Sequence, residues 1–325
     1  MSVYGYDIFH EKLAEGLIAG VRRDNPPHAY IFEGKKGLGR FETARLFAAA
    51  LACGAANAPC GACNSCISAK AGTNPDISVV EPDAKRKTIG AERIRALIED
   101  AGVKPFMSKR KIYIFPDASL LTEKAQNAFL KLLEEPPDYA VFIIIAENSE
   151  LLLQTVRSRC VNIRFAAISD ERMRAYVDKI NPGCKNADFI VKYSQGIPAA
   201  AREIIGDAEF DELRRLCLDK LRLLFGSDML AAYTLCDFAE KNKERADLIL
   251  SLWSSFVRDI LFIQSGAKSL ITNSDFTALL SEHAARADEK RALRVLEQLL
   301  LTEQMLRRYV SLHAAFLHLG LSVCG

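Results

Sequence analysis

The stretch "AYIFEGKKGLGRFETARLFAAALA" (29–52) joins a short apolar run to a loop with three glycines and then to a helix-like segment. The glycines are Gly34, Gly37 and Gly39. A strand that enters a glycine-rich loop and leaves it as a helix is the setting in which backbone N–H groups bind phosphate. The stretch therefore predicts an α/β domain with a phosphate loop after its first strand.

Further runs of apolar, β-branched or aromatic residues follow, and helix-like segments separate them. Strands that are apolar on both faces and alternate with helices indicate a parallel sheet covered on both sides. We therefore predict a five-stranded parallel sheet with helices on both faces. The expected strands are 29–34, 76–82, 110–117, 140–147 and 160–165, and the expected helices are 39–53, 90–101, 119–134 and 149–157.

After about residue 166 the strand signal ends and helical periodicity replaces it. Two short helices are expected first, and leucines then recur at helical spacing over 289–318. The short helices are 169–181 and 186–206, the second split at Gly196-Ile197-Pro198. We predict an α/β domain (1–165), a small helical domain (166–208) and an all-α domain (209–325).

Composition limits the classes of function. The chain has 325 residues, of which 50% are hydrophobic, and its formal net charge is +2, so it has no overall electrostatic footprint for nucleic acid or a membrane surface. The longest apolar stretch, "AVFIIIA" (140–146), is too short to span a bilayer, and the N-terminus lacks the pattern of a signal peptide. Nine cysteines in such a chain do not suggest a disulfide framework. We expect a cytoplasmic protein without membrane contact.

The glycine loop departs from the phosphate-binding pattern. A working loop continues with Lys, which reaches the outer phosphates, and with Ser or Thr, which ligates magnesium. Arg40 and Phe41 hold these positions here, and the later strand that should end in two acids ends in Pro116 and Asp117. Because Phe41 cannot ligate a metal and one acid is missing, we expect no ATP hydrolysis and no ATP cofactor for this chain. The glycine backbone and Arg40 leave open weak phosphate binding without magnesium.

A second constellation is "ACGAANAPCGACNSC" (52–66), which contains Cys53, Cys60, Cys63 and Cys66. Two Cys-x-x-Cys steps overlap, and such steps let pairs of thiolates face one ion. Four thiolates complete a tetrahedral zinc shell with no position for water, so the metal would be structural. The alternatives are unliganded thiols or a redox pair, which needs only two cysteines. We predict a structural zinc module at about 53–66.

The glycine loop and the cysteine module occur together with "NAFLKLLEEPP" (127–137) and "TVRSRC" (155–160). Over about residues 4–206 this set resembles the bacterial clamp-loader subunits, which are AAA+ proteins of the DNA polymerase III holoenzyme. The rest resembles them in architecture only. The resemblance implies an AAA+ nucleotide-binding-like domain, a helical lid domain, and a C-terminal collar domain through which the subunits assemble.

Within that family, a chain that has Arg40, Phe41 and Pro116 at these positions resembles the stator, the member that does not hydrolyse ATP. The gamma/tau subunits, which do, carry a nucleotide-sensing Arg where this chain has Ala199. The Arg of "SRC", here Arg159, reaches the ATP of a neighbouring gamma/tau subunit in the family, as an arginine finger in trans. Without the resemblance, Arg159 would be read as a surface residue in a weak salt bridge.

The resemblance implies as partners the gamma/tau and delta subunits, the sliding clamp, and primer-template DNA within the complex. Candidate DNA contacts are Lys104, Lys109, Arg110 and Lys111, although clusters of this size are more often solvated. Two alternative functions stay open from the sequence. One is an ATP-hydrolysing, gamma/tau-like subunit, and the other is a zinc-dependent nucleic-acid-binding module.

Overall fold

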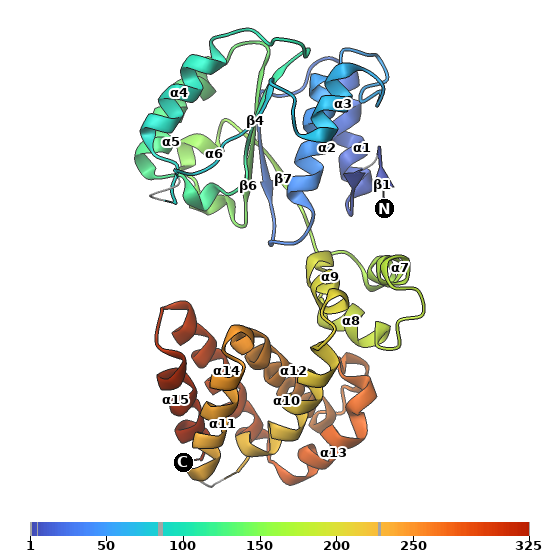
Figure 1. Cartoon of the computed structure of the whole chain (residues 1–325), viewed down its shortest axis with the longest axis vertical. Coiled ribbons are helices and arrows are strands. Elements are labelled where there is room, and N and C mark those ends of the chain that lie inside the picture. Colours follow the sequence, from blue (N-terminus) through green and yellow to red (C-terminus); the bar gives the residue numbers. More distant parts are fainter. Residues whose placement is uncertain (1, 5, 84–86, 227–228, 325) are drawn as a thin grey trace. The chain divides into compact units, whose positions relative to one another are not determined.

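The computed structural model describes residues 2–4, 6–83, 87–226 and 229–324 (Figure 1). The chain forms two compact units. Unit 1 comprises Met1–Tyr176 and Gly196–Ala200, and unit 2 comprises Val177–Gln195 and Ala201–Gly325. Each unit has its own core and is described separately.

Unit 1 is built on a five-stranded sheet with the order β4-β5-β6-β3-β7. Every neighbouring pair is parallel. The strands are β3 (Ala29–Glu33), β4 (Ile77–Val79), β5 (Lys111–Phe115), β6 (Ala140–Ala146) and β7 (Val161–Arg164). All five lie within the predicted segments, so the predicted parallel α/β fold is confirmed.

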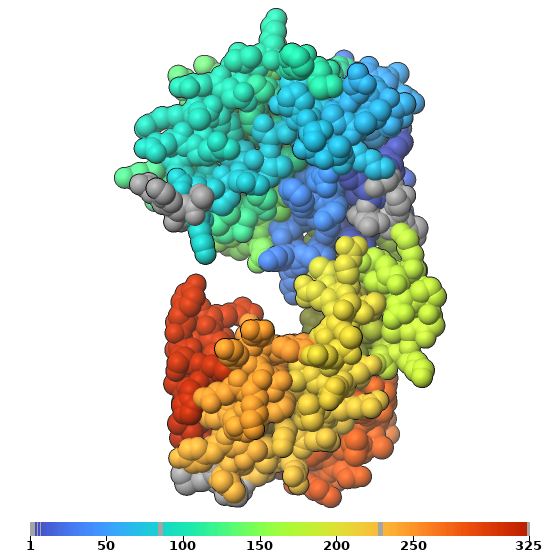
Figure 2. Space-filling view, viewed as in Figure 1, coloured from blue at the N-terminus to red at the C-terminus, as the bar shows by residue number. Residues whose placement is uncertain are grey.

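Helices cover both faces of this sheet (Figure 1). Successive strand residues point to opposite faces, so Tyr30 and Phe32 pack on one side while Ala29 and Ile31 pack on the other. The first face is covered by α1 (Glu11–Arg22), α2 (Arg40–Ala52) and α3 (Asn64–Ala71), and the second by α4 (Ala91–Ala101), α5 (Glu123–Glu134) and α6 (Gln154–Arg157). In Figure 2 the visible surface of unit 1 is formed largely by the blue segment of α2 and α3 and the teal segment of α4.

The strand order places the glycine loop at a topological switch point. From β3 the chain crosses to β4 at the edge of the sheet, returns through β5 and β6, and adds β7 on the other side of β3. Ligands of open α/β sheets bind at such a point, outside the carboxyl ends of the strands. The glycine loop therefore lies at the carboxyl edge, whereas the residues just before β7 lie at the amino edge.

The remaining elements are short strands and helices. A hairpin of β1 (Ser2–Val3) and β2 (Tyr6–Asp7) precedes α1, and the short 3-10 helices are η1 (Ala118–Leu120), η2 (Ser149–Leu151), η3 (Lys243–Arg245), η4 (Lys268–Leu270) and η5 (Ser274–Phe276). The later helices are α7 (Asp170–Ile180), α8 (Ala187–Tyr193), α9 (Pro198–Gly206), α10 (Phe210–Leu224), α11 (Met229–Lys241), α12 (Ala246–Gln264), α13 (Thr277–Arg286), α14 (Glu289–Arg307) and α15 (Leu312–Cys324). In the described chain no helix is both long and apolar enough to cross a membrane.

The leucine-rich stretch 289–318 is two helices rather than one. After Arg307, Tyr309 adopts a left-handed conformation with φ 63°. Its N–H donates to the carbonyl of Leu306, and the N–H of Val310 donates to that of Met305. This is the hydrogen-bond pattern of a Schellman helix end, which lets the chain turn back into α15.

The core of unit 2 surrounds α12, in which Trp253 and Phe256 are fully buried. A polar cluster lies beside this core. Arg214 of α10 is only 2% exposed, lies over the ring of Phe189, and donates to Asp275 and Asn273. Asn273 in turn donates to Asp259 of α12. The cluster therefore ties α10, α12 and the segment around η5 together.

Replacing Arg214 by Ala should lower the free energy of unfolding of unit 2 by about 3 kcal/mol, because it removes a buried side chain and leaves the buried amide oxygen of Asn273 without its charged donor. Trp253 is the single tryptophan, so its fluorescence during urea unfolding reports on this unit. Arg215→Ala is the matched control, because Arg215 is exposed and should change the value by about 0.5 kcal/mol or less. Equal effects of the two substitutions would contradict the role given to the cluster.

Candidate functional site

The glycine loop makes close contacts with the segment that opens α9. Gly37 has φ +89°, and a Cβ placed on it would lie 2.8 Å from both the Cβ of Ala199 and the Cγ2 of Ile197. The backbone N–H of Ala199 donates to the carbonyl of Gly37 over 3.3 Å. Ile197 and Ala199 thus pack on the loop as closely as glycine permits. Sequence reasoning had singled out Ala199 but not this contact.

Arg40 occupies the lysine position and is turned into the protein. It is the first residue of α2, is 8% exposed, and its Nη1 donates to the carbonyl of Ala146 at the end of β6 over 2.5 Å. Burial lowers the pKa of its guanidinium, and the nearby carboxylates of Glu147 and Asp117 oppose that shift. The charged Arg40 guanidinium is therefore engaged with the main chain at the end of β6.

Phe41 and Asp117 occupy the positions expected to serve magnesium, and both have structural contacts instead. The ring of Phe41 packs against the first-face core and lines a 310 Å³ pocket with Ile77 and Ile114. Asp117 accepts hydrogen bonds from the N–H and the Oγ of Ser119 and so caps η1. Phe41 offers no ligand to a metal ion, and the Asp117 carboxylate is engaged by Ser119 within η1.

A carboxylate that sequence reasoning missed lies at the start of the loop. Glu33, the last residue of β3, accepts from Asn162 Nδ2 over 2.6 Å and from the N–H of Ser149 over 3.2 Å. The bond from Asn162 is the main reason that the pKa of Glu33 is lowered, so the group is charged near neutral pH. This negative charge, which the Arg164 guanidinium partly offsets from 3.6 Å, disfavours the binding of an anion. Its only signal in the sequence was its position directly before Gly34.

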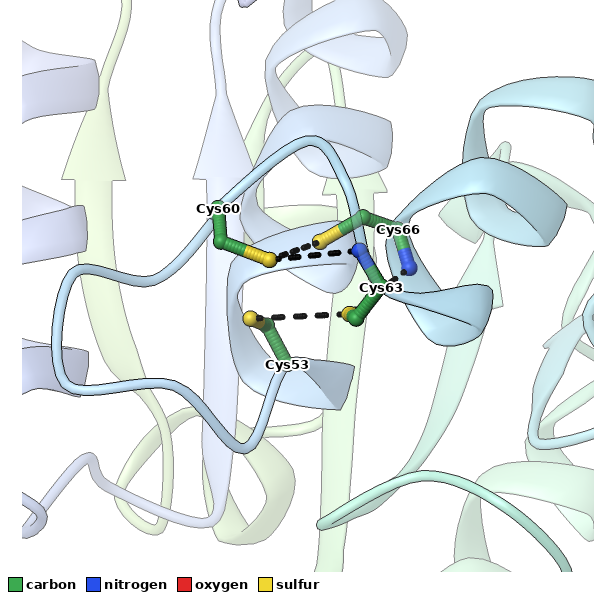
Figure 3. A group of neighbouring side chains, drawn as sticks. All are labelled: Cys53, Cys60, Cys63 and Cys66. Carbon is green, nitrogen blue, oxygen red and sulfur yellow. Dashed lines mark hydrogen bonds between the residues drawn. The ribbon is translucent and has the colours of Figure 1, made fainter.

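The four predicted metal ligands converge (Figure 3). Cys53 follows α2, Cys60 lies in the loop, and Cys63 and Cys66 lie at the start of α3. All four Sγ atoms lie within 4.8 Å of one another, with 3.9 Å between Cys53 and Cys63 and 4.0 Å between Cys60 and Cys66. Four sulfurs at Zn–S distances of 2.3 Å in a tetrahedron are about 3.8 Å apart. The thiols are therefore close enough to hold one metal ion.

Backbone hydrogen bonds and burial shift the pKa values of these thiols in different directions. The N–H of Cys63 donates to Cys60 Sγ, and the N–H of Cys66 donates to Cys63 Sγ, each over 3.4 Å. Backbone donors, first that of Ala62, lower the pKa of Cys60 to about 6. Burial and the neighbouring thiols raise the pKa of Cys66 to about 12. Crowded thiolates repel one another, so a cation at their centre is what would stabilise four of them together.

Arg159 lies at the other edge of the sheet, directly after α6. Its Nη2 donates to Glu134 Oε1 over 2.7 Å, its Nη1 donates to the carbonyl of Thr155 over 2.9 Å, and its side chain is 35% exposed. Glu134, the last residue of α5, was not singled out from the sequence, although it belongs to the quoted "LLEEPP".

The register of β3 and β7 separates Arg159 from the glycine loop of its own chain. Val161 pairs with Tyr30, and Gly34 lies four residues further along. Four residues of strand span about 13 Å, and Arg159 precedes Val161 by two more. Arg159 therefore cannot serve a phosphate at its own glycine loop.

Most of the basic residues considered for DNA are held by intramolecular ion pairs. Lys109 and Arg110 both contact Asp24, at 2.7 and 3.3 Å. Lys111 is 6% exposed and its Nζ binds Asp100 over 2.8 Å. The expectation that Lys111 belongs to a surface cluster was wrong, because it begins a buried strand.

Two family models together match most of the chain. The model described as "DNA polymerase III, delta subunit" matches residues 9–169, and the one described as "DNA polymerase III, delta subunit, C terminal" matches residues 208–314. The chain belongs to the clamp-loader subunits of DNA polymerase III. It is 28% identical over 313 residues to the DNA polymerase III subunit delta' of Bacillus subtilis, covering 94% of this chain and 93% of that one.

Other relatives and solved structures are similar to this chain over half of its length or more. The gamma/tau subunit of Mycobacterium tuberculosis is 36% identical over 166 residues, which are 50% of this chain and 28% of that protein. Among solved structures, a gamma-subunit-related protein of Thermotoga maritima aligns with TM-score 0.40 and 18% identity over 90% of this chain and 98% of that one. The clamp-loader delta protein of Bacillus subtilis aligns with TM-score 0.35 and 16% identity over 96% and 99%.

Proposed function

We propose that this chain is the stator of the sliding-clamp loader, a delta'-type subunit that does not hydrolyse ATP and supplies Arg159 in trans to a neighbouring ATPase subunit. The observation that carries the proposal is the division between the two edges of the sheet. The carboxyl edge holds a glycine loop without phosphoryl-transfer groups, and the amino edge holds an ordered, partly exposed arginine.

The vestigial site comprises Gly34, Gly37, Gly39, Arg40, Phe41 and Asp117. Phosphoryl transfer is catalysed mainly by positioning and by charges that neutralise the transferred group. Here the Arg40 guanidinium binds a main-chain carbonyl, Phe41 is apolar, and Asp117 binds Ser119. Glu33 adds a negative charge, and Ile197 and Ala199 cover Gly37. These features favour a loop that keeps its shape without turnover.

The cysteine cluster is best explained as a structural zinc site. All four ligands would be thiolates from Cys53, Cys60, Cys63 and Cys66, which leaves no open position for water or substrate. The residues between Cys53 and Cys60 are mostly small. Ala58 is buried and its carbonyl accepts from Arg22 Nε over 2.8 Å, and a metal would add a crosslink to this packing. Zinc would hold the start of α3 against the end of α2.

An exposed apolar loop in unit 1 favours a protein partner there. Phe106 is 86% exposed, and Val103 and Met107 near it in the chain are 62% and 38% exposed. The loop is nevertheless held in place, because the Asp76 carboxylate accepts from the N–H groups of Phe106, Met107 and Ser108 over 2.6 to 2.8 Å. A group of large apolar side chains exposed on an ordered loop is typical of a surface that another protein covers.

The proposed partners are the gamma/tau and delta subunits, the sliding clamp, and primer-template DNA within the assembled complex, in the cytoplasm. The family match supports this assembly, because the similar proteins are DNA polymerase III subunits. We retain as proposals the domain limits 1–165, 166–208 and 209–325 and the role of the last as the collar.

The purified protein should carry one zinc ion per chain. Cys63→Ser should abolish stoichiometric zinc and increase hydrogen exchange over residues 53–71, because structural zinc contributes folding energy directly. Since the thiols must lose their protons to bind, the metal should be released as the pH falls. Elemental analysis checks this, with Cys184→Ser as the control outside the cluster. Metal-free protein after reducing, chelator-free purification would disprove the site.

The isolated chain should show no magnesium-dependent ATP hydrolysis, measured as phosphate release. Phe41→Thr should not restore it, because Pro116 still holds the position of the missing acid and Ala199 still lies against Gly37. Steady turnover that co-purifies with the protein and disappears in Arg40→Ala would show instead that the chain is a gamma/tau-like ATPase.

Arg159→Ala should leave folding and complex assembly intact and slow ATP hydrolysis at the one site that borders this subunit. Fingers of this kind contribute about a thousand-fold or more in rate at their own site. Total ATPase should fall less, because other sites keep their own fingers. DNA-stimulated ATPase and clamp loading of the reconstituted complex measure both effects.

Arg164→Ala is the control for that experiment, because its side chain is 84% exposed, lies at the far end of β7, and makes only a long contact of 3.6 Å with Glu33. Arg157 is less suitable because its Nε is buried and has no hydrogen-bond partner among the described residues. Normal rates for Arg159→Ala in a correctly assembled complex would rule out the finger, and equal losses for both variants would indicate a general electrostatic effect.

A further inference from the structure

Glu134 is the charged partner of the proposed finger, and its geometry is specific. The last residue of α5 brings its Oε1 to 2.7 Å from Arg159 Nη2. On the other side, the carbonyl of Thr155 in α6 receives Nη1 over 2.9 Å. Two terminal nitrogens of one guanidinium are thus anchored to two different helices. We propose that Glu134 is the positioning residue of the trans arginine, a role that rests on the finger function proposed above.

The anchored guanidinium keeps donors for a phosphate. Arginine carries five N–H groups in a planar fork, and the bonds to Glu134 and Thr155 use two of them. A further contact between Nη1 and Ser158 Oγ is long, at 3.5 Å. The side chain is 35% exposed, so the remaining N–H groups are accessible to an anionic group from a neighbouring subunit. Glu134 therefore orients the guanidinium and leaves some of its N–H donors available.

Holding the Arg159 side chain in one orientation affects the rate of the reaction it assists more than it affects folding stability. A free arginine side chain carries about 2 kcal/mol of rotamer entropy, which is lost when it engages a phosphate. A finger that is already held loses less of it on engagement, and small errors of placement at a reacting centre can cost about a hundred-fold in rate. An exposed ion pair, by contrast, changes folding stability by about 0–1 kcal/mol. The proposal therefore predicts a large effect on rate with a small effect on stability.

The chain provides a matched control at the next residue. Glu135 has the same charge, is also exposed, and follows directly after α5. Its backbone N–H donates to the carbonyl of Lys131, and no ion pair of its carboxylate is found among the described residues. A general effect of negative charge near Arg159 would appear in both glutamates, whereas positioning through the 2.7 Å contact would appear in Glu134 alone.

The test is steady-state kinetics of the reconstituted complex with the gamma/tau and delta subunits, the clamp and primed DNA. Glu134→Ala should lower DNA-stimulated kcat and clamp loading, by about tenfold at the bordering site, with KM for ATP unchanged. Glu134→Gln should restore much of the rate, because its amide oxygen still accepts from Nη2. Glu135→Ala should match wild type, and thermal unfolding should be the same for all variants.

The double variant Glu134→Ala/Arg159→Ala separates positioning from other roles. If Glu134 acts only through Arg159, the double variant should be no slower than Arg159→Ala alone. A wild-type rate for Glu134→Ala, a faster rate, or an additive loss in the double variant would overturn the positioning role while leaving the finger in place. Normal rates for Arg159→Ala itself would remove the finger, and the positioning role with it.

Discussion

The parallel register of the sheet is the constraint on which the functional arrangement depends. Because all five strands run the same way, everything that follows a strand lies at one edge and everything that precedes a strand lies at the other. The glycine loop follows β3, whereas Arg159 and Glu134 precede β7 and β6. One domain can therefore offer an arginine to a neighbouring molecule at one edge without that arginine reaching the loop at the other.

Strand and helix positions could be predicted because their signal is local. Runs such as "AVFIIIA" are buried on both faces of a covered sheet, and they begin and end near glycine, proline or charged residues. The break at Tyr309 escaped prediction because a left-handed tyrosine at a helix end has no strong signal, the usual residue being glycine. Lys111 was misjudged because its partner, Asp100, lies in a different element, the helix α4, 11 residues earlier in the chain.

The candidate site was predictable to different degrees for the same reason. Four cysteines within 14 residues must lie near one another because the chain between them is short, and the structure brings all four together. The partners of Arg159 and Arg40 could not be inferred, because Glu134 is 25 residues away and Ala146 is 106 residues away. Such contacts arise from strand order, which depends on long-range packing. Arg40 and Phe41 in the sequence predicted that the loop lacks the Lys and the hydroxyl of a working phosphate loop. Only the structure shows that Arg40 binds a main-chain carbonyl and that Phe41 packs against the core.

The glycine loop also shows why glycines alone are weak evidence for a nucleotide. A Cβ on Gly34 would lie 2.5 Å from the carbonyl oxygen of Phe165, and one on Gly39 would lie 2.7 Å from the ring of Phe9. Together with Ile197 and Ala199 over Gly37, these contacts require glycine at each position through packing within unit 1. The loop can thus hold its shape with no phosphate bound, since neighbouring side chains and backbone occupy the space that the missing Cβ atoms leave. Evidence for nucleotide chemistry has to come from the residues that follow the last glycine, and here those residues turn inward.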